Sequence, residues 1–326
     1  MSDVAEKAGV STMTVSRVLR HSKQVRTEVR QRVLATAEAL GYEVDEGLGK
    51  AMSLSKLRRS RGTAGTIAML RCIDRMGASD TKLPSVAIEP VRSQALKDGF
   101  GLDYLEVEND TSSVQQVERV LEARGTAGLI VVPKVLDHAI QKMAFENFPV
   151  VTVGYALPWP GLTRVATDLI HGTFEVMELL CARNCQRVGL AVTRFCDERV
   201  NHGFTGGYLA ALSRQGMEPP CPILWLDSID PDLRAAAIAD WVRANQLDAV
   251  LSTETVAPMR SVQYVNLDAE EANCGGGVLG ISHNRDEVAV QAVNQLVSQM
   301  IAGIKGIPAI PVCIQVPSKL IGAARL

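Results

Sequence analysis

The sequence lacks several features that would assign it to other classes of protein. No apolar run approaches the roughly 20 residues that a membrane-spanning helix requires, and no signal peptide begins the chain. The chain has neither a G-x-x-x-x-G-K-[ST] phosphate-binding loop nor a G-x-S-x-G nucleophile turn. These absences argue against a membrane protein and against two large groups of enzymes. We therefore expect a cytoplasmic protein that is not an enzyme.

Cysteine and histidine are few and scattered. The seven cysteines are odd in number, as expected of reduced thiols in the cytoplasm. Cys181 and Cys185 lie four residues apart with Cys196 nearby, but this spacing matches no ordinary zinc pattern. The five histidines are equally dispersed. We expect no bound metal and no cofactor.

One glycine-rich stretch fits the letters of a dinucleotide-binding motif. Gly275 to Gly280 read G-x-G-x-x-G, but they follow the polar stretch AEEANC instead of an apolar strand. The strand, loop and helix that cradle a pyrophosphate are therefore missing. The match is weak support for an enzyme.

Charge is distributed unevenly along the 326 residues. Hydrophobic residues make up 47% and charged residues 21%, which suits a chain of two or three domains with real cores. The formal net charge is only -2, yet residues 1–62 contain 12 Lys and Arg against 7 Asp and Glu. A basic N-terminal part on an acidic remainder suits a protein in which only that part is drawn to phosphate.

The N-terminal residues have the pattern of a helix-turn-helix. A short helix over residues 3–8 ends at Gly9, and Ser11 is placed to cap a second helix. In that second helix Val15, Val18 and Leu19 share one face, and the opposite face is mostly polar. A third helix over residues 27–40 is expected to bury Val29, Val33, Ala37 and Leu40. The second helix of such a domain can lie in the major groove of DNA.

These residues also resemble the N-terminal domain of the lactose/galactose-repressor type of bacterial transcription regulator. DVAEKAGVSTMTVSRVL, QVRTEVRQRV and ALGY match that domain almost position by position. The resemblance implies that Thr12 and Met13 read bases and that Arg17 also faces base edges. The other DNA-contacting positions, at or near phosphates or on the same polar face, are Ser11, Thr14, Ser16, Arg20, Gln24, Arg26 and Arg30.

Residues 45–63 are rich in glycine and serine and end in a basic cluster. One interpretation is a solvated linker. The resemblance implies instead a hinge that folds into a short helix in the DNA minor groove and wedges an apolar side chain between base pairs. The wedging position falls on Ala51, with Met52 as a candidate substitute, and Val44 and Asp45 replace the usual proline and asparagine. Both interpretations stay open.

Beyond residue 64 strands and helices alternate. Apolar strands are predicted over 66–70, 102–107, 128–132, 150–153, 188–192, 223–226 and 249–252. Helices are predicted over 86–99, 114–124, 136–145, 171–182, 206–215 and 232–244. This rhythm predicts an α/β fold of two doubly wound parallel-sheet subdomains, in which ligands bind beyond the carboxyl ends of the strands.

The resemblance extends over this region and implies a periplasmic-binding-protein-like core. It predicts a helix-turn-helix domain over 1–44, a hinge over 45–63 and an effector-binding and dimerisation core over 64–326. The chain would cross between subdomains near 165–185, 280–290 and 310–315, and the final helix would be followed by GIPA and two strands. No leucine-heptad tail follows, so we expect a homodimer.

Four positions that hold the effector in sugar-responsive members fall here on His171, Phe204, Glu254 and Asp268. Phe204 replaces an arginine that is common in the family, so a stacking surface would replace a guanidinium. Each of the four has an ordinary structural interpretation as well. The alternatives are Arg199, Asn201 and His202, together with the polar loop Ser282, His283, Asn284 and Arg285.

The sequence thus predicts a dimeric, sequence-specific regulator of transcription, a repressor. Its expected partners are double-stranded operator DNA, a small-molecule effector of the sugar class and a second copy of the chain. The alternative is a ligand-binding α/β protein or an enzyme without operator-specific DNA binding.

Overall fold

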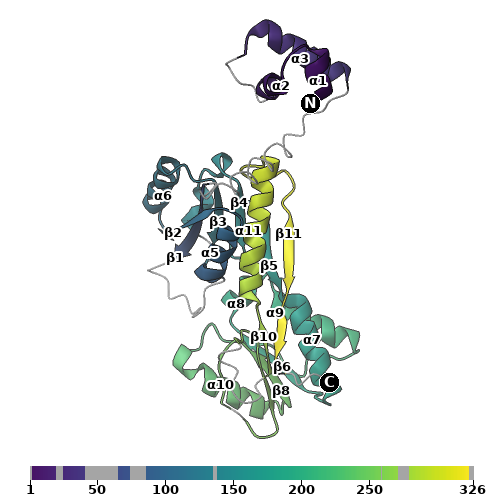
Figure 1. Ribbon diagram of the computed structural model, residues 1–326. Coiled ribbons are helices and arrows are strands. Elements are labelled where there is room, and N and C mark those ends of the chain that lie inside the picture. Colours follow the sequence, from purple (N-terminus) through teal and green to yellow (C-terminus); the bar gives the residue numbers. More distant parts are fainter. Residues whose placement is uncertain are drawn as a thin grey trace. The chain divides into compact units, whose positions relative to one another are not determined.

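A computed structural model describes residues 2–19, 25–40, 65–73, 86–134, 138–257, 259–270 and 279–322 (Figure 1). The chain divides into two compact units, Met1–Ser55 and Lys56–Leu326, and each is considered by itself. In the described ranges, no helix is both long enough and apolar enough to traverse a bilayer.

The first unit contains three short helices around one small core. They are α1 (Ser2–Lys7), α2 (Thr12–Leu19) and α3 (Thr27–Ala39). Gly9 turns the chain between α1 and α2 with a φ of 63°, a conformation that favours glycine. The buried core is formed by Val4, Ala5, Ala8, Val15, Val18, Val33 and Ala37, with Val10, Val29 and Leu40 packed against it. The predicted helix-turn-helix arrangement is confirmed.

The first lobe of the second unit contains a parallel sheet in the order β11-β5-β4-β3-β1-β2. Its strands are β1 (Thr66–Ile73), β2 (Gly101–Glu108), β3 (Gly128–Val132), β4 (Val150–Val153), β5 (Arg164–Asp168) and β11 (Cys313–Pro317). Helices α5 (Ile88–Lys97), α6 (Thr111–Ala123) and α11 (Arg285–Ala302) pack on it.

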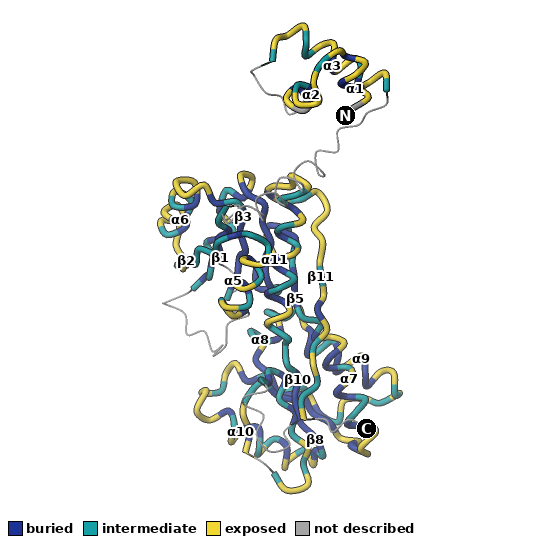
Figure 2. The backbone as a smooth tube through the Cα atoms, viewed as in Figure 1, coloured by how far each residue is buried: buried dark blue, intermediate teal, exposed yellow. Residues whose placement is uncertain are grey.

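The second lobe contains a sheet in the order β12-β10-β9-β8-β6-β7, parallel except for the edge strand β12. Its strands are β6 (Val188–Val192), β7 (Leu224–Trp225), β8 (Ala249–Ser252), β9 (Gln263–Asn266), β10 (Leu279–Ser282) and β12 (Lys319–Ile321). Its helices are α7 (Leu169–Ala182), α8 (Arg194–Glu198), α9 (Gly203–Arg214) and α10 (Pro231–Ala244). The central strands β3, β4, β6 and β8 of the two sheets are buried along their whole length (Figure 2).

The chain passes between the two lobes at three points. β5 of the first lobe leads into α7 of the second, β10 of the second leads into α11 of the first, and β11 of the first leads into β12 of the second. Two hydrogen bonds link these crossings: Thr167 Oγ1 donates to the carbonyl of His283, and Asn284 Nδ2 donates to the carbonyl of Pro317. The two doubly wound lobes that the alternating pattern predicted are confirmed.

The helix predicted over residues 136–145 is wrong. In the described part of this range the chain forms two 3₁₀ turns, Ala139–Lys142 and Phe145–Asn147. The side chains of Asn109 and Glu118 accept the backbone N–H groups of Ala139 and Ala144, at 2.7 Å each. These N–H groups are satisfied without a helix, and no local sequence pattern reveals partners so distant in the chain.

Helices α7 and α9 are held closely together by a glycine, which provides a stability test. A Cβ atom added at Gly207 would lie 2.4 Å from the carbonyl oxygen of Ile170 and 2.7 Å from Cβ of Thr173. At Gly206, one residue earlier in the same helix, the nearest atom would lie at 3.8 Å. Gly207→Ala should lower the free energy of unfolding by about 1–3 kcal/mol, because the added methyl group forces apart two closely packed helix backbones.

Gly206→Ala is the matched control and should leave stability unchanged or raise it by up to about 1 kcal/mol, through the higher helix propensity of alanine. Chemical denaturation followed by circular dichroism measures both. Equal effects of the two substitutions would show that the close approach does not contribute to stability.

Candidate nucleic-acid interface and ligand site

The outward face of α2 carries the residues predicted to read bases. The backbone N–H of Thr14 donates to Ser11 Oγ at 3.2 Å, so Ser11 caps α2 as the sequence predicted. Val15 and Val18 are buried in the core of the domain, whereas Met13 is 63% exposed. Thr12 and Arg17 are also exposed. These side chains therefore point away from the protein interior and are available to a partner.

The other predicted DNA contacts are only partly described. Ser11 and Arg26 are exposed, and Thr14 and Arg30 are half-buried. Ser16 belongs to α2, but its side chain is outside the description, and Arg20, Gln24, Ala51 and Met52 lie outside the described residues. Their roles stay predictions.

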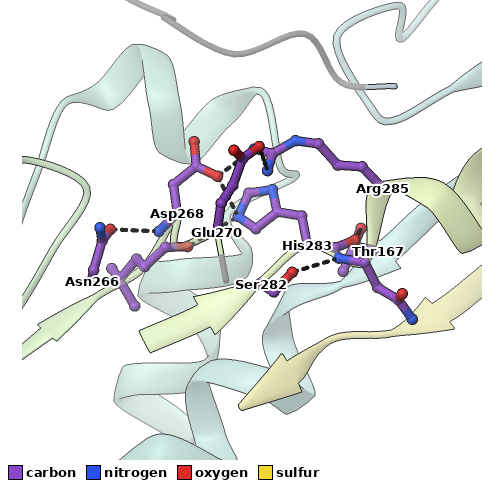
Figure 3. Close-up of polar contacts among 9 residues, drawn as sticks. Thr167, Asn266, Asp268, Glu270, Ser282, His283 and Arg285 are labelled. Carbon is purple, nitrogen blue, oxygen red and sulfur yellow. Dashed lines mark hydrogen bonds and ion pairs between the residues drawn. The ribbon is translucent and has the colours of Figure 1, made fainter. Parts of the chain in front are cut away.

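An ionic cluster lies at the carboxyl ends of β9 and β10 (Figure 3). Arg285, at the start of α11, donates from Nη2 to Asp268 Oδ1 and from Nη1 to Glu270 Oε1, the latter at 3.4 Å. His283 donates from Nε2 to the carbonyl of Leu267 at 3.0 Å, with the same nitrogen 3.5 Å from Asp268 Oδ1. We call Asp268, Glu270, His283 and Arg285 the junction cluster.

Burial and charge act in opposite directions on this cluster. Burial raises the pKa of Asp268, but the charges of His283, Arg285 and Arg199 outweigh it, so that pKa lies below its ordinary value. Burial lowers the pKa of His283 more than Asp268 raises it. At neutral pH Asp268 is therefore ionised and pairs with Arg285.

The structure separates the four predicted effector residues. Asp268 lies within the junction cluster. His171 is exposed on the first turn of α7, where its ring lies 3.2 Å from the Glu175 carboxylate. Its backbone N–H donates to Asp168 Oδ1 at 3.0 Å, so the helix start itself accounts for this residue.

The expected stacking surface at Phe204 is not found. Its side chain is 1% exposed and packs in the core with Leu169 and Tyr208, between the helices and the sheet. Its ring centre lies 6.2 Å from that of His283, so the ring lies beside the junction cluster without an open face. The apolar pattern of α9 buries this position, and stacking by a ligand would require the core to open.

Glu254 serves as the partner of a buried arginine. Arg234 of α10 is 5% exposed and donates from Nη1 to Glu254 Oε1 at 3.1 Å and from Nε to the carbonyl of Ile229 at 3.2 Å. A buried guanidinium needs a nearby carboxylate, and this requirement explains Glu254 without a ligand.

The alternative effector residues named in the sequence analysis divide in the same way, into members of the junction cluster and residues with other partners. Arg199 directly follows α8, and its charge lowers the pKa of both Asp268 and His283. His202 instead pairs with the buried Asp197, its Nδ1 lying 3.1 Å from Oδ2, and Asn201 is exposed. In the polar loop, His283 and Arg285 join the cluster, whereas Ser282 and Asn284 bond the backbone.

Two cations of the first lobe were missed from the sequence. Arg71 lies near the carboxyl end of β1 in register with Val132, and Lys134 follows β3 by two residues. A cation that directly follows an apolar strand, as in GLIVVPK, is the signal that could have identified Lys134. Among the described residues, no group of three or more His, Cys, Asp and Glu could hold a metal ion.

An N-terminal helix-turn-helix unit and a two-lobed α/β unit define the class of helix-turn-helix proteins with a periplasmic-binding-protein-like core. Residues 1–45 match the sequence model of bacterial regulatory proteins of the lacI family. The resemblance to that family drawn from the N-terminal residues is thus confirmed over residues 1–45.

Curated relatives and solved structures agree. The PurR-type transcriptional repressor of Mannheimia succiniciproducens is 22% identical over 71% of this chain and 66% of its own length. The sucrose operon repressor of Escherichia coli is 40% identical over 56% of this chain and 52% of its own length. The matches span about two thirds and about half of these relatives. A lac repressor dimer bound to operator and an anti-inducer has the same fold, with a TM-score of 0.57 at 18% identity over 98% of this chain and 96% of that one.

The ion pair of Glu254 provides a test of whether this residue is structural. Replacing Glu254 by Gln leaves a buried guanidinium without its carboxylate, so a double-mutant cycle of Glu254→Gln with Arg234→Met should give a coupling of about 1–3 kcal/mol in unfolding free energy. The matched pair on the same helix, Arg243 and Asp240, is 72% and 74% exposed. Its cycle, Arg243→Met with Asp240→Asn, should stay below about 0.5 kcal/mol.

Urea denaturation of each variant gives the coupling energies. Similar small couplings for both pairs would remove the structural explanation of Glu254 and return it to the set of candidate ligand residues.

Proposed function

We propose that this protein is a dimeric, sequence-specific DNA-binding transcription regulator, a repressor, whose DNA affinity is controlled by a small molecule bound where its two core lobes meet. The observation that carries the proposal is the outward face of α2: Thr12, Met13 and Arg17 are exposed, although two valines of the same short helix are buried. An exposed Met13 adds nothing to the stability of the folded domain, whereas a methionine side chain can contact base edges in a groove.

Each residue of this face has a chemical role suited to DNA. Arg17 can pair bidentately with guanine, Thr12 can exchange hydrogen bonds with a base edge, and Met13 can contact a thymine methyl group. Phosphates would be held by the hydroxyl, amide and cationic side chains of Ser11, Thr14, Ser16, Arg20, Gln24, Arg26 and Arg30. Ala51 and Met52 are the proposed minor-groove residues of the hinge.

A two-fold dimer would place two such helices on a near-palindromic site, as suits a protein with one reading helix per chain. The lac repressor structure of the same fold is a dimer bound to its operator. The proposed organisation is a reading domain over 1–44, a hinge over 45–63 and a core over 64–326. The protein would act in the bacterial cytoplasm, on nucleoid DNA.

Control by an effector would use the three crossings between the lobes. A ligand that binds one arrangement of the lobes more tightly than the other shifts their equilibrium, and the dimer transmits the shift to the spacing of the two reading domains. The relative named for the sucrose operon supports an effector of the sugar class. Of the effector residues that the sequence suggested, His171, Phe204, Glu254 and Asp268, the proposal retains Asp268, because it belongs to the junction cluster.

Arg17→Ala tests the reading role of α2. Loss of one bidentate contact should weaken binding to a DNA site selected from a random pool by the unaltered protein by about 1–3 kcal/mol, and relax specificity at one base pair. Arg32→Ala on α3, an exposed arginine outside the proposed interface, is the control; it should leave the base preference unchanged.

Titrations of labelled selected and scrambled DNA at fixed salt provide the measurement. If Arg17→Ala discriminates between the two DNAs as well as the unaltered protein, α2 does not read sequence. If the unaltered protein shows no discrimination, the chain is a ligand-binding protein and not a regulator of specific sites.

A further inference from the structure

Four cationic side chains stand at the carboxyl ends of the strands of the two core sheets. In the first lobe, Arg71 lies near the end of β1 and Lys134 just beyond the end of β3, the strand paired with β1. In the second lobe, Arg199 follows α8, which follows β6. Arg285 lies on the crossing between the lobes, where it begins α11 directly after β10. The topology of the sheets, and not one charged segment, brings these residues together.

These two sheet ends face each other. β5 and β11 leave the carboxyl end of the first sheet directly into the second lobe, and β10 leaves the carboxyl end of the second sheet directly into the first lobe. The carboxyl ends of both sheets must therefore lie at the junction between the lobes, and α8 lies there (Figure 1). This is the position at which open α/β sheets bind ligands.

Lys134 has no counterion in the described part of the chain. Burial lowers the pKa of its ammonium group, and the like charges of Arg71 of its own lobe and Arg199 of the opposite lobe lower it further. Arg199 directly follows α8, which lies at the junction, and Lys134 follows the carboxyl end of β3, so cations from both lobes approach the same junction. Like charges held together in a partly desolvated site leave an unmet need for an anion.

The acids nearby are already engaged. Asp268 and Glu270 both bind Arg285, and Glu106 lies 3.7 Å from Arg71. The Nε of Arg285 is buried and has no acceptor among the described residues. Among the described residues, Arg285 thus has a donor without an acceptor, and Lys134 is a cation without an anion.

We propose that the effector is a small anion, carrying a phosphate or carboxylate group, held between Lys134 and Arg71 of the first lobe, Arg199 of the second, and Arg285 at the crossing between them. The inference rests on the proposed function only in placing the effector at the lobe junction. Planar guanidinium groups bind such anions bidentately, and Lys134 adds a compact charge from the opposite side.

An anion there would act on the arrangement of the lobes. Without a ligand, Lys134 and Arg199 repel each other across the junction. A bound phosphate or carboxylate replaces that repulsion by two attractions, which favours approach of the lobes.

The test compares three probes on the full chain: glucose 6-phosphate, gluconate and glucose. The melting temperature is measured against each at constant ionic strength, so that general salt effects cancel. We expect glucose 6-phosphate, gluconate or both to raise the melting temperature by a few degrees with saturation, and glucose to have no effect. The stronger of the two anions identifies the group that the site binds.

Lys134→Gln should weaken the binding of the active probe at least tenfold. Because Lys134 makes no ion pair in the described chain, this variant should fold with an unchanged or higher melting temperature. Lys142→Gln, an exposed lysine of the same lobe, is the matched control and should respond like the unaltered protein. Both variants keep the basic N-terminal domain unchanged, so an anion bound there would affect their melting temperatures equally.

Three results would each overturn the proposal: no saturable response to either anion, an equal response to glucose, or an unchanged response in Lys134→Gln. The DNA titrations with Arg17→Ala are independent of this outcome. A protein that responds to anions without reading DNA would refute the regulator, and one that reads DNA without responding to anions would refute only the anion site.

Discussion

The core depends on one constraint: its chain passes between the two lobes three times at a single junction. Each passage leaves a sheet at its carboxyl end, and hydrogen bonds from Thr167 to His283 and from Asn284 to Pro317 fix the passages to one another. The lobes can therefore change their angle only by moving the residues that lie next to these passages. His283 and Arg285 are such residues, because they occupy the passage itself between β10 and α11. Electrostatics at the junction and lobe geometry are thus coupled by the covalent chain.

The junction cluster illustrates how a buried ion pair can serve specificity more than stability. Bringing Asp268 and Arg285 together out of water costs nearly as much as their attraction returns, so a well-packed apolar pair would hold the lobe as firmly. What charged groups add is sensitivity to other charges. Asp268 responds to Arg199, His283 and Arg285 together, and a charge that enters the junction changes the balance among all of them.

Much of this architecture could be predicted from the sequence, for identifiable reasons. The three N-terminal helices followed from apolar spacing, from Gly9 and from the capping Ser11, all of which are local signals. The strands over 128–132, 150–153, 188–192 and 249–252 were predicted with their observed bounds, because fully buried strands are short apolar runs. The ligand site was harder to predict from the sequence. Phe204 was expected at a surface, but tertiary packing buries its face of α9, and the local sequence does not show this. Lys134 can be recognised as a candidate site residue only once the fold places the end of β3 opposite the second lobe.

The distribution of charge resolves an apparent conflict between the two proposed partners, DNA and a small anion. Both partners carry phosphate or carboxylate groups, and a surface open to one could be occupied by the other. Of the basic side chains that the structure describes, Arg17 of α2 is exposed on a convex helix, where a DNA groove can reach it. Those of the junction are half-buried between two lobes and lie within residues 63–326, a part of the chain with 22 Lys and Arg against 29 Asp and Glu. An acidic body repels the DNA backbone at long range, while a small anion, whose charge is screened over about 8–10 Å, can still enter a local cationic site. The size of the anion and the sign of the surrounding surface therefore suffice to separate the two proposed partners, DNA and the small anion.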